Sequence, residues 1–152
     1  MRTPANVFDV AQYILNKLGA ITTWKLQKLC YYCQAWSLVW DDEPMFQQKI
    51  EAWANGPVIP TLYEEHRGKF EVDDIGGKPT HLTTCQKDTI DAVLKTYGDK
   101  TSAWLSALTH SEPPWRLARE RDNLGPGERG NAEIHWDDMI EYYEGLCAED
   151  EE

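Results

Sequence analysis

Long apolar runs are absent from this sequence, and none approaches the roughly 18 residues that suggest a membrane-spanning helix. The N-terminal residues also lack the apolar stretch of a secretory signal. We therefore expect a cytoplasmic protein with no membrane partner. Ten glycines and eight prolines among 152 residues are an average share, which excludes collagen-like and low-complexity chains.

Basic residues are absent from the last twenty positions. Residues 133–152 hold nine acidic residues and no lysine or arginine, whereas residues 1–132 hold seventeen acidic and fifteen basic ones. The formal net charge of −11 is therefore concentrated at the C-terminal end. Such a surface repels phosphate and favours a basic partner, so we expect no direct nucleic-acid partner. The alternative is an acidic tail that only keeps the protein in solution.

A recognisable zinc site is absent, because the four cysteines do not have the spacing of one. Cys30 and Cys33 have the C-x-x-C spacing, but they lie within a helical pattern and share its apolar face. We interpret them as buried, unreactive thiols, with a metal site or redox chemistry as alternatives. The sequence predicts no metal ion and no cofactor.

Helical periodicity covers most of the chain and predicts a mainly α-helical protein. We expect a compact single domain over residues 1–147, with about six to eight helices and at most a small strand pair. A disordered acidic tail is expected at 148–152. Thr3 is the expected N-cap of the first helix, and Thr83 with Gln86 forms a predicted capping box. A helix from residue 22 or 23 to 39 has aromatic residues on several faces, which predicts a central position.

Two segments are harder to interpret. Residues 45–53 fit a short helix followed by an extended stretch, and residues 121–131 are rich in glycine and predict a mobile loop. Glu112 precedes two prolines, where we expect it to cap the next helix. His110 then lies at a helix end, where its ring would donate to terminal carbonyls.

Motifs that carry catalysis are also missing: there is no G-x-S-x-G, P-loop, G-x-G-x-x-G or H-E-x-x-H. We therefore expect no enzyme and no catalytic residue. A small hydrolase that uses His110 as a base remains an alternative, because Glu112 is close in sequence. An acidic mimic of nucleic acid is a further alternative, suggested by the charge.

Three blocks of the sequence resemble the Panacea antitoxin domain family, which includes SocA-like antitoxins and phage-associated GepA-like proteins. The first is L-Q-K-L-C-Y-Y-C-Q-A-W at residues 26–36. The second, at residues 50–63, contains A-W-A-N-G-P-V, and the third, at residues 104–115, ends in T-H-S-E-P-P-W. The three blocks follow one another in the order typical of the family.

The resemblance implies a helical domain that neutralises a cognate protein toxin, commonly encoded nearby, by direct protein–protein binding. It also suggests an alternative, in which the protein is an adaptor that delivers its toxin to a bacterial protease. We expect structural roles for five motif residues: Gly56, Pro57, Val58, Pro114 and Trp115. Six others are predicted to contact the partner: Lys28, Tyr32, Gln34, Trp53, Tyr63 and His110. For Lys28, Gln34 and Tyr63, buried hydrogen bonds that hold the motifs together are the alternative.

Overall fold

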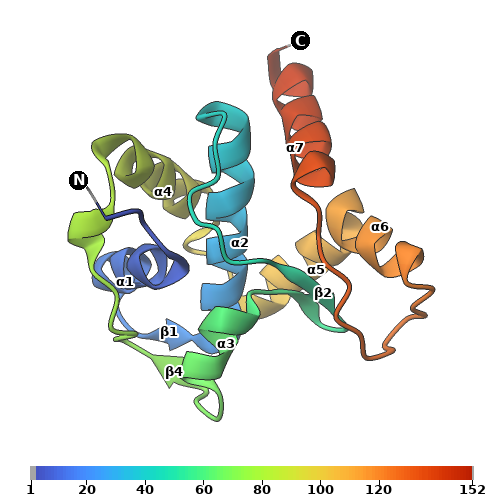
Figure 1. The fold of residues 1–152 in the computed structure, drawn as a ribbon, viewed down its shortest axis with the longest axis horizontal. Coiled ribbons are helices and arrows are strands. Elements are labelled where there is room, and N and C mark those ends of the chain that lie inside the picture. The colour runs from blue at the N-terminus through green and yellow to red at the C-terminus, as the bar shows by residue number, and fades with distance from the viewer. Residues whose placement is uncertain (1–2, 152) are drawn as a thin grey trace.

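The computed structural model describes residues 3–151 (Figure 1). This part of the chain contains the helices α1 (Val7–Leu18), α2 (Thr23–Trp40), α3 (Pro60–His66), α4 (Thr84–Tyr97), α5 (Ser102–Ser111), α6 (Pro113–Arg121) and α7 (Trp136–Glu151), with a 3-10 turn η1 (Pro79–His81). β1 (Ile21–Thr22) pairs with β4 (Glu71–Val72), and β2 (Glu51–Trp53) pairs with β3 (Gly56–Val58), both antiparallel. The predicted mainly α-helical class is confirmed, although the described residues include two small strand pairs and not one.

Helix α2 forms the centre of the molecule (Figure 1). Helices α1, α4, α5 and α7 pack around it, together with β3. Every side chain from Leu26 to Leu38 is buried, which agrees with the aromatic residues on several of its faces. A helix that is covered on all sides needs no polar stripe, because no face of it meets water.

The polar side chains on α2 bind the backbone of neighbouring loops. Gln34 accepts hydrogen bonds from the amides of Met45 at 2.8 Å and Phe46 at 3.2 Å, and its own amide donates to the Phe46 carbonyl at 2.7 Å. The Met45 and Phe46 amides and the Phe46 carbonyl are thus bonded to the Gln34 side chain. Residues 45–50 form an irregular segment and not the expected short helix. The extended stretch that follows is present as β2.

A second glutamine of α2 holds the junction between β3 and α3. The side chain of Gln27 accepts a hydrogen bond from the Ile59 amide at 2.8 Å and also contacts the ring nitrogen of buried His66 at 2.9 Å. Such hydrogen bonds offset the free-energy cost of removing a buried amide from water. The first sequence block therefore fixes the second block against the core.

Buried tyrosines surround the carboxylate of Glu112. Tyr32 and Tyr143 donate hydrogen bonds to it at 2.7 and 2.9 Å, and the hydroxyl of Tyr31 lies 3.0 Å from that of Tyr143. Burial raises the pKa of Glu112, while the two phenol hydrogen bonds act against this shift. Glu112 occupies the N-cap position of α6 but makes no side-chain cap, which corrects the expected capping role.

Helix ends agree with the sequence in one case and differ in two. Thr83 and Gln86 form the predicted capping box of α4. Helix α1 begins after Asn6, whose capping box with Asp9 replaces the expected cap at Thr3. Helix α7 includes residues 148–151, where we expected a disordered tail, and residue 152 lies outside the described residues.

The two cysteines of the C-x-x-C spacing are buried within α2. Burial raises the pKa of both thiols, and the nearby Cys30 adds to the shift at Cys33. Both thiols therefore stay protonated near neutral pH, as expected of unreactive core residues. No helix in the described part of the chain has the length and apolar character that are needed to cross a bilayer.

Candidate functional site

The β2–β3 hairpin brings the second and third sequence blocks together. Its two-residue turn is Ala54–Asn55, because Trp53 pairs with Gly56. From α6, the Trp115 indole donates to the Trp53 carbonyl at 2.8 Å, and the Arg119 guanidinium donates to the Ala52 carbonyl at 2.9 Å. The Trp115 side chain thus connects α6 to the hairpin.

Gly56 allows the hairpin to approach α2 and α5 closely. Its φ is +131°, which side-chain-bearing residues rarely adopt, and a Cβ there would lie 3.3 Å from Lys28 Cε and 3.5 Å from Thr109 Oγ1. Pro57 and Val58 follow as buried strand residues. Residues from all three blocks thus meet at this glycine.

The loop between α6 and α7 is anchored to the same hairpin. Buried Arg119 also donates to the carbonyls of Gly125 and Glu128. After the loop, Ala52 donates to the Ala132 carbonyl at 2.7 Å, so the chain runs beside β2. These bonds hold a segment for which the sequence predicted a mobile loop, and they place residues 129–131 over the hairpin.

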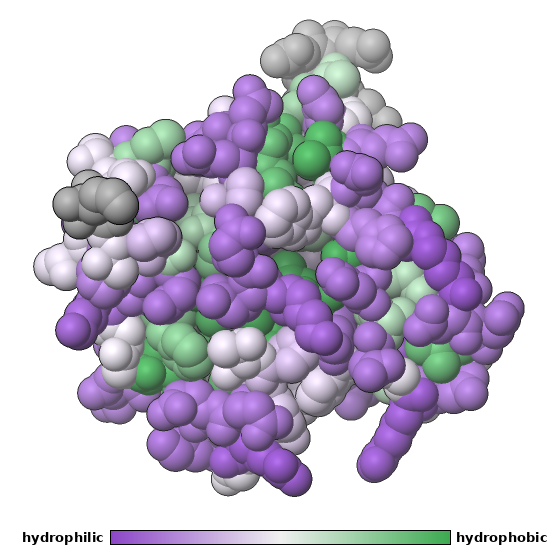
Figure 2. Space-filling view, in the orientation of Figure 1, coloured by the Kyte–Doolittle hydropathy of each residue, from purple (hydrophilic) through white to green (hydrophobic). Residues whose placement is uncertain are grey.

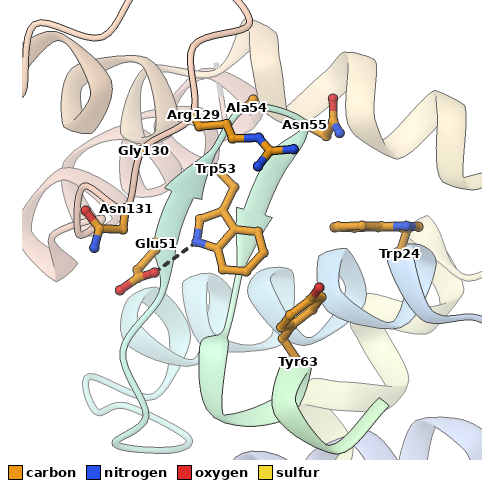
Figure 3. A pocket seen from close by; sticks show the side chains of 9 residues that line it. All are labelled: Trp24, Glu51, Trp53, Ala54, Asn55, Tyr63, Arg129, Gly130 and Asn131. Atoms are coloured by element: carbon orange, nitrogen blue, oxygen red, sulfur yellow. Dashed lines mark hydrogen bonds between the residues drawn. The ribbon is translucent and has the colours of Figure 1, made fainter. Parts of the chain in front are cut away.

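A first hollow of about 520 Å³ lies beside the hairpin (Figure 3). The Trp53 indole forms one wall of this hollow. It packs edge-to-face on the Tyr63 ring, with 4.9 Å between the ring centres, and its nitrogen donates a hydrogen bond to Glu51 Oε1 at 2.9 Å. The Arg129 side chain reaches across the top of Trp53 toward Asn55 (Figure 3). The complete lining is Trp24, Glu51, Trp53, Ala54, Asn55, Tyr63, Arg129, Gly130 and Asn131.

A second hollow of about 440 Å³ adjoins the first, and the two share Trp24 and Asn55. Its lining is Trp24, Lys28, Asn55, Ser102, Ala103, Ser106 and His110. Ser102, Ser106 and His110 recur every fourth position of α5, and Ala103 lies three residues before Ser106, so all four residues lie on one face of the helix. We call the two hollows together the motif surface, after the sequence blocks that supply most of it.

Lys28 is the buried cation of the second hollow. It is 1% exposed, its ammonium lies 5.5 Å from the centre of the Trp24 ring, and its hydrogen bond to the Trp24 carbonyl is long, at 3.4 Å. Burial lowers the pKa of Lys28 to about 8. Within the described residues, no carboxylate lies within ion-pair distance of it.

His110 stacks on Trp115, with ring centres 4.2 Å apart and an angle of 8° between the planes. Its Nε2 is buried and has no hydrogen-bond partner among the described residues. The backbone group that interacts with the ring is that of Asn55 in the hairpin, which differs from the expected donation to helix-end carbonyls. Burial lowers the pKa of His110, the charges of Lys28 and Arg119 lower it further, and the Asn55 backbone acts in the opposite direction.

The predicted contact residues fall into two groups. Lys28, Trp53, Tyr63 and His110 all line the motif surface. The side chains of Tyr32 and Gln34 are fully buried, so a partner would not reach them in this structure. Their observed hydrogen bonds are internal, which for Gln34 is the alternative role that the sequence suggested.

Four residues at the site were not singled out from the sequence: Trp24, Asn55, Arg119 and Arg129. Asn55 stands between Trp53 and Gly56, where the hairpin signal N-G identifies a turn. Trp24 lies one helical turn before Lys28, so the i, i+4 spacing places both on one face of α2. No local signal identifies Arg119 or Arg129, because their positions depend on contacts with the distant hairpin.

The fold and the site define a mainly helical domain in which separated sequence blocks meet at one hollowed, aromatic surface. A family model described as "Antitoxin SocA-like, Panacea domain" matches residues 26–116. The match spans more than half of the chain, and the chain belongs to this antitoxin-like family. Searches of curated proteins and of solved structures found no match.

Proposed function

We propose that this protein is an antitoxin that neutralises a cognate protein toxin by direct binding through the motif surface. The observation that carries the proposal is the meeting of residues from all three family blocks at two adjoining hollows. Trp24, Trp53 and Tyr63 are half-buried there, with polar groups at the rim. Half-buried aromatic residues with a polar rim are typical of protein-binding hot spots.

Exposed apolar side chains elsewhere give a weaker argument for a binding surface. Trp40, Phe70, Trp104 and Leu117 are the large exposed ones among the described residues, and they belong to four separate segments. The face drawn in Figure 2 is covered mainly by hydrophilic side chains, with small hydrophobic patches between them. Single exposed apolar residues are common on protein surfaces, so we place the toxin at the motif surface.

The proposal includes a binding role without catalysis. No aspartate or glutamate is present among the described residues that line the second hollow. The carboxylate of Glu112, which the hydrolase alternative would need beside His110, instead accepts from Tyr32 and Tyr143. His110 thus lacks the oriented acid–base partner that hydrolysis commonly uses. Such an antitoxin would act in the cytoplasm, where its toxin is made.

The charge of the C-terminal region supports a basic toxin. Residues 133–152 contain nine acidic residues and no basic one, and several of them lie on α7, outside both hollows. An acidic patch raises the rate at which a basic partner approaches, while hydrophobic and hydrogen-bonding contacts determine how long it stays. The motif surface would therefore hold the bound toxin, and the acidic residues of α7 would speed its approach.

Co-expression with the product of the neighbouring reading frame tests the proposal. The wild-type protein should restore growth and co-purify with that product. Asn55→Arg places a long charged side chain at the rim shared by both hollows and should abolish both effects. Gln47→Arg adds the same side chain at an exposed position that lines neither hollow, and it should behave as wild type.

Two outcomes would contradict the proposal. Growth rescue that survives Asn55→Arg, with the variant folded, would place the toxin elsewhere. Rescue that is lost in cells without their ATP-dependent proteases, with accumulation of the bound partner, would favour the proteolytic adaptor over direct neutralisation. Direct binding should rescue growth equally well in such cells.

A further inference from the structure

The second hollow contains a positive charge for which the described residues supply no counter-ion. Lys28 is almost fully buried, and its ammonium donates to a backbone carbonyl, that of Trp24, at the long distance of 3.4 Å. A lysine ammonium has three donor hydrogens. Burial of an ammonium without an anion is costly, because the charge loses its hydration and gains little in return.

An unused polar atom lines the same hollow. His110 Nε2 is buried and has no hydrogen-bond partner among the described residues, and His110 lines the hollow from α5 while Lys28 lines it from α2. The ring itself is held in place by its stacking on Trp115. A buried ammonium and a buried ring nitrogen, on residues from different helices, therefore occur at one space of about 440 Å³, and the described lining contains no acidic group.

We propose that the second hollow is a carboxylate-binding site, in which Lys28 Nζ and His110 Nε2 bind an aspartate or glutamate side chain of the protein partner. This inference rests on the proposed function for the identity of the partner, but the site itself is a property of the free protein. The partner's carboxylate would supply the counter-ion that Lys28 lacks. The hydroxyls of Ser102 and Ser106 and the amide of Asn55 can donate to the same group.

A carboxylate fits this site better than a phosphate does. It carries one negative charge and two oxygens, which match one ammonium and one imidazole that donates from Nε2 when it takes up a proton beside the carboxylate. A phosphate group would bring more negative charge to a protein whose net charge is already −11, and nucleic acid would bring a continuous line of such charges. A toxin that is basic overall can still bind the motif surface, with one of its acidic side chains buried in the second hollow.

Sodium acetate is the probe for the free site, with sodium phosphate at equal ionic strength as the comparison. The full chain, labelled with ¹³C and ¹⁵N, is titrated while the side-chain NMR signals of Lys28 and His110 are followed. Acetate should shift both signals with one saturable curve. Lys28→Met should weaken acetate binding at least tenfold, whereas Lys25→Met, on the same helix but outside the hollow, should leave it unchanged.

Three results would overturn the site: no saturable response of the wild-type signals to acetate, a response that is unchanged in Lys28→Met, or phosphate binding at least tenfold tighter than acetate. The wild-type titration needs no variant, so it stands even where a variant fails to fold. Failure of the toxin experiment alone would leave acetate binding intact, which separates the two proposals. If the toxin binds, Lys28→Met should lower its affinity at least tenfold, and an unchanged affinity would overturn the assignment of the carboxylate to the partner.

Discussion

Single buried polar residues determine much of the behaviour of this protein. Lys28 places a positive charge inside the molecule, and Glu112 places a negative one among tyrosines. The two groups differ in how they are satisfied, because Glu112 accepts two phenol hydrogen bonds while Lys28 has one long bond to a carbonyl. Glu112 is therefore satisfied within the fold, whereas Lys28 is the residue whose environment we propose to be completed by a ligand.

Stability should depend on pH through Lys28. Burial lowers its pKa from 10.5 to about 8. Between these two values the unfolded chain retains a proton that the folded protein has released, so the contribution of Lys28 to the free energy of unfolding rises with pH. Below about pH 8, burial of the charge costs about 3 kcal/mol. Lys28→Met should therefore be more stable than wild type at pH 7, and the difference should shrink by pH 9.5.

Urea denaturation at the two pH values measures this difference. The comparison cancels the opposite effect of the buried thiols, which are the same in both proteins. Lys95→Met, at an exposed position on α4, should change the free energy of unfolding little at either pH. A Lys28→Met variant that is less stable than wild type at pH 7 would show that the charge is compensated within the fold.

The tyrosine cluster gives a second prediction at the scale of residues. Tyr143→Phe removes the hydroxyl that lies between Glu112 and Tyr31, so a buried carboxylate loses one of its two donors. We expect the free energy of unfolding to fall by about 1–3 kcal/mol, measured by urea denaturation. Tyr13→Phe removes an exposed hydrogen bond to Asp91 and should cost less than about 0.5 kcal/mol. Equal losses in the two variants would contradict the role of burial.

At the scale of elements, the β2–β3 hairpin is the part that connects the helices to the site. It contacts α2, α5 and α6, and the segment that leads into α7 runs beside it. Its turn residues form the rim shared by the two hollows. A change in the hairpin backbone should therefore affect both folding stability and the shape of the motif surface.

Gly56→Ala tests this dependence. The positive φ and the close approach of Lys28 Cε make the substitution unfavourable, and we expect a loss of about 1–3 kcal/mol in the free energy of unfolding. Gly145→Ala is the matched control, because Gly145 lies within α7 with nothing within 4 Å of the added Cβ. That change should be neutral or stabilise by about 0.5–1 kcal/mol. Thermal melting of both variants measures the contrast, and a neutral Gly56→Ala would contradict it.

At the scale of the whole molecule, the uneven distribution of charge acts over the longest distance. Acidic residues gather in the C-terminal region, while the site that we propose for the toxin lies at the hairpin. Screening by salt acts on the distant charges far more than on contacts inside a hollow. Association and dissociation of the complex should therefore respond differently to ionic strength.

The rate of association with the toxin should fall at least tenfold between about 50 and 500 mM salt, with a much smaller change in the dissociation rate. Replacing Asp137, Glu141 and Glu144, which are exposed on α7, by their amides should slow association at low salt. Replacing Glu64, Glu71 and Asp88 by their amides changes the net charge equally at exposed positions outside the C-terminal region and should have a smaller effect. Stopped-flow kinetics gives both rates, and an association rate that is indifferent to salt would count against steering.

Local patterns predicted much of this fold. The capping box of Thr83 and Gln86 is a contact between residues three apart, so the sequence contains all of it. The central position of α2 followed from aromatic residues on several of its faces. The start of α1 was misplaced, because Asn6 and Asp9 form a capping box of their own, and the distant Gln48 side chain accepts a hydrogen bond from the Val7 amide.

The sequence by itself determined the helical class, the family blocks and the concentration of acidic charge, since each depends on residues close together in the chain. Only the tertiary structure decided which motif residues meet the surface. Gln34 and Lys28 are both polar residues of α2, yet one binds a loop and the other borders a hollow. Burial depends on what packs against a residue from elsewhere in the chain, and no local spacing contains that information.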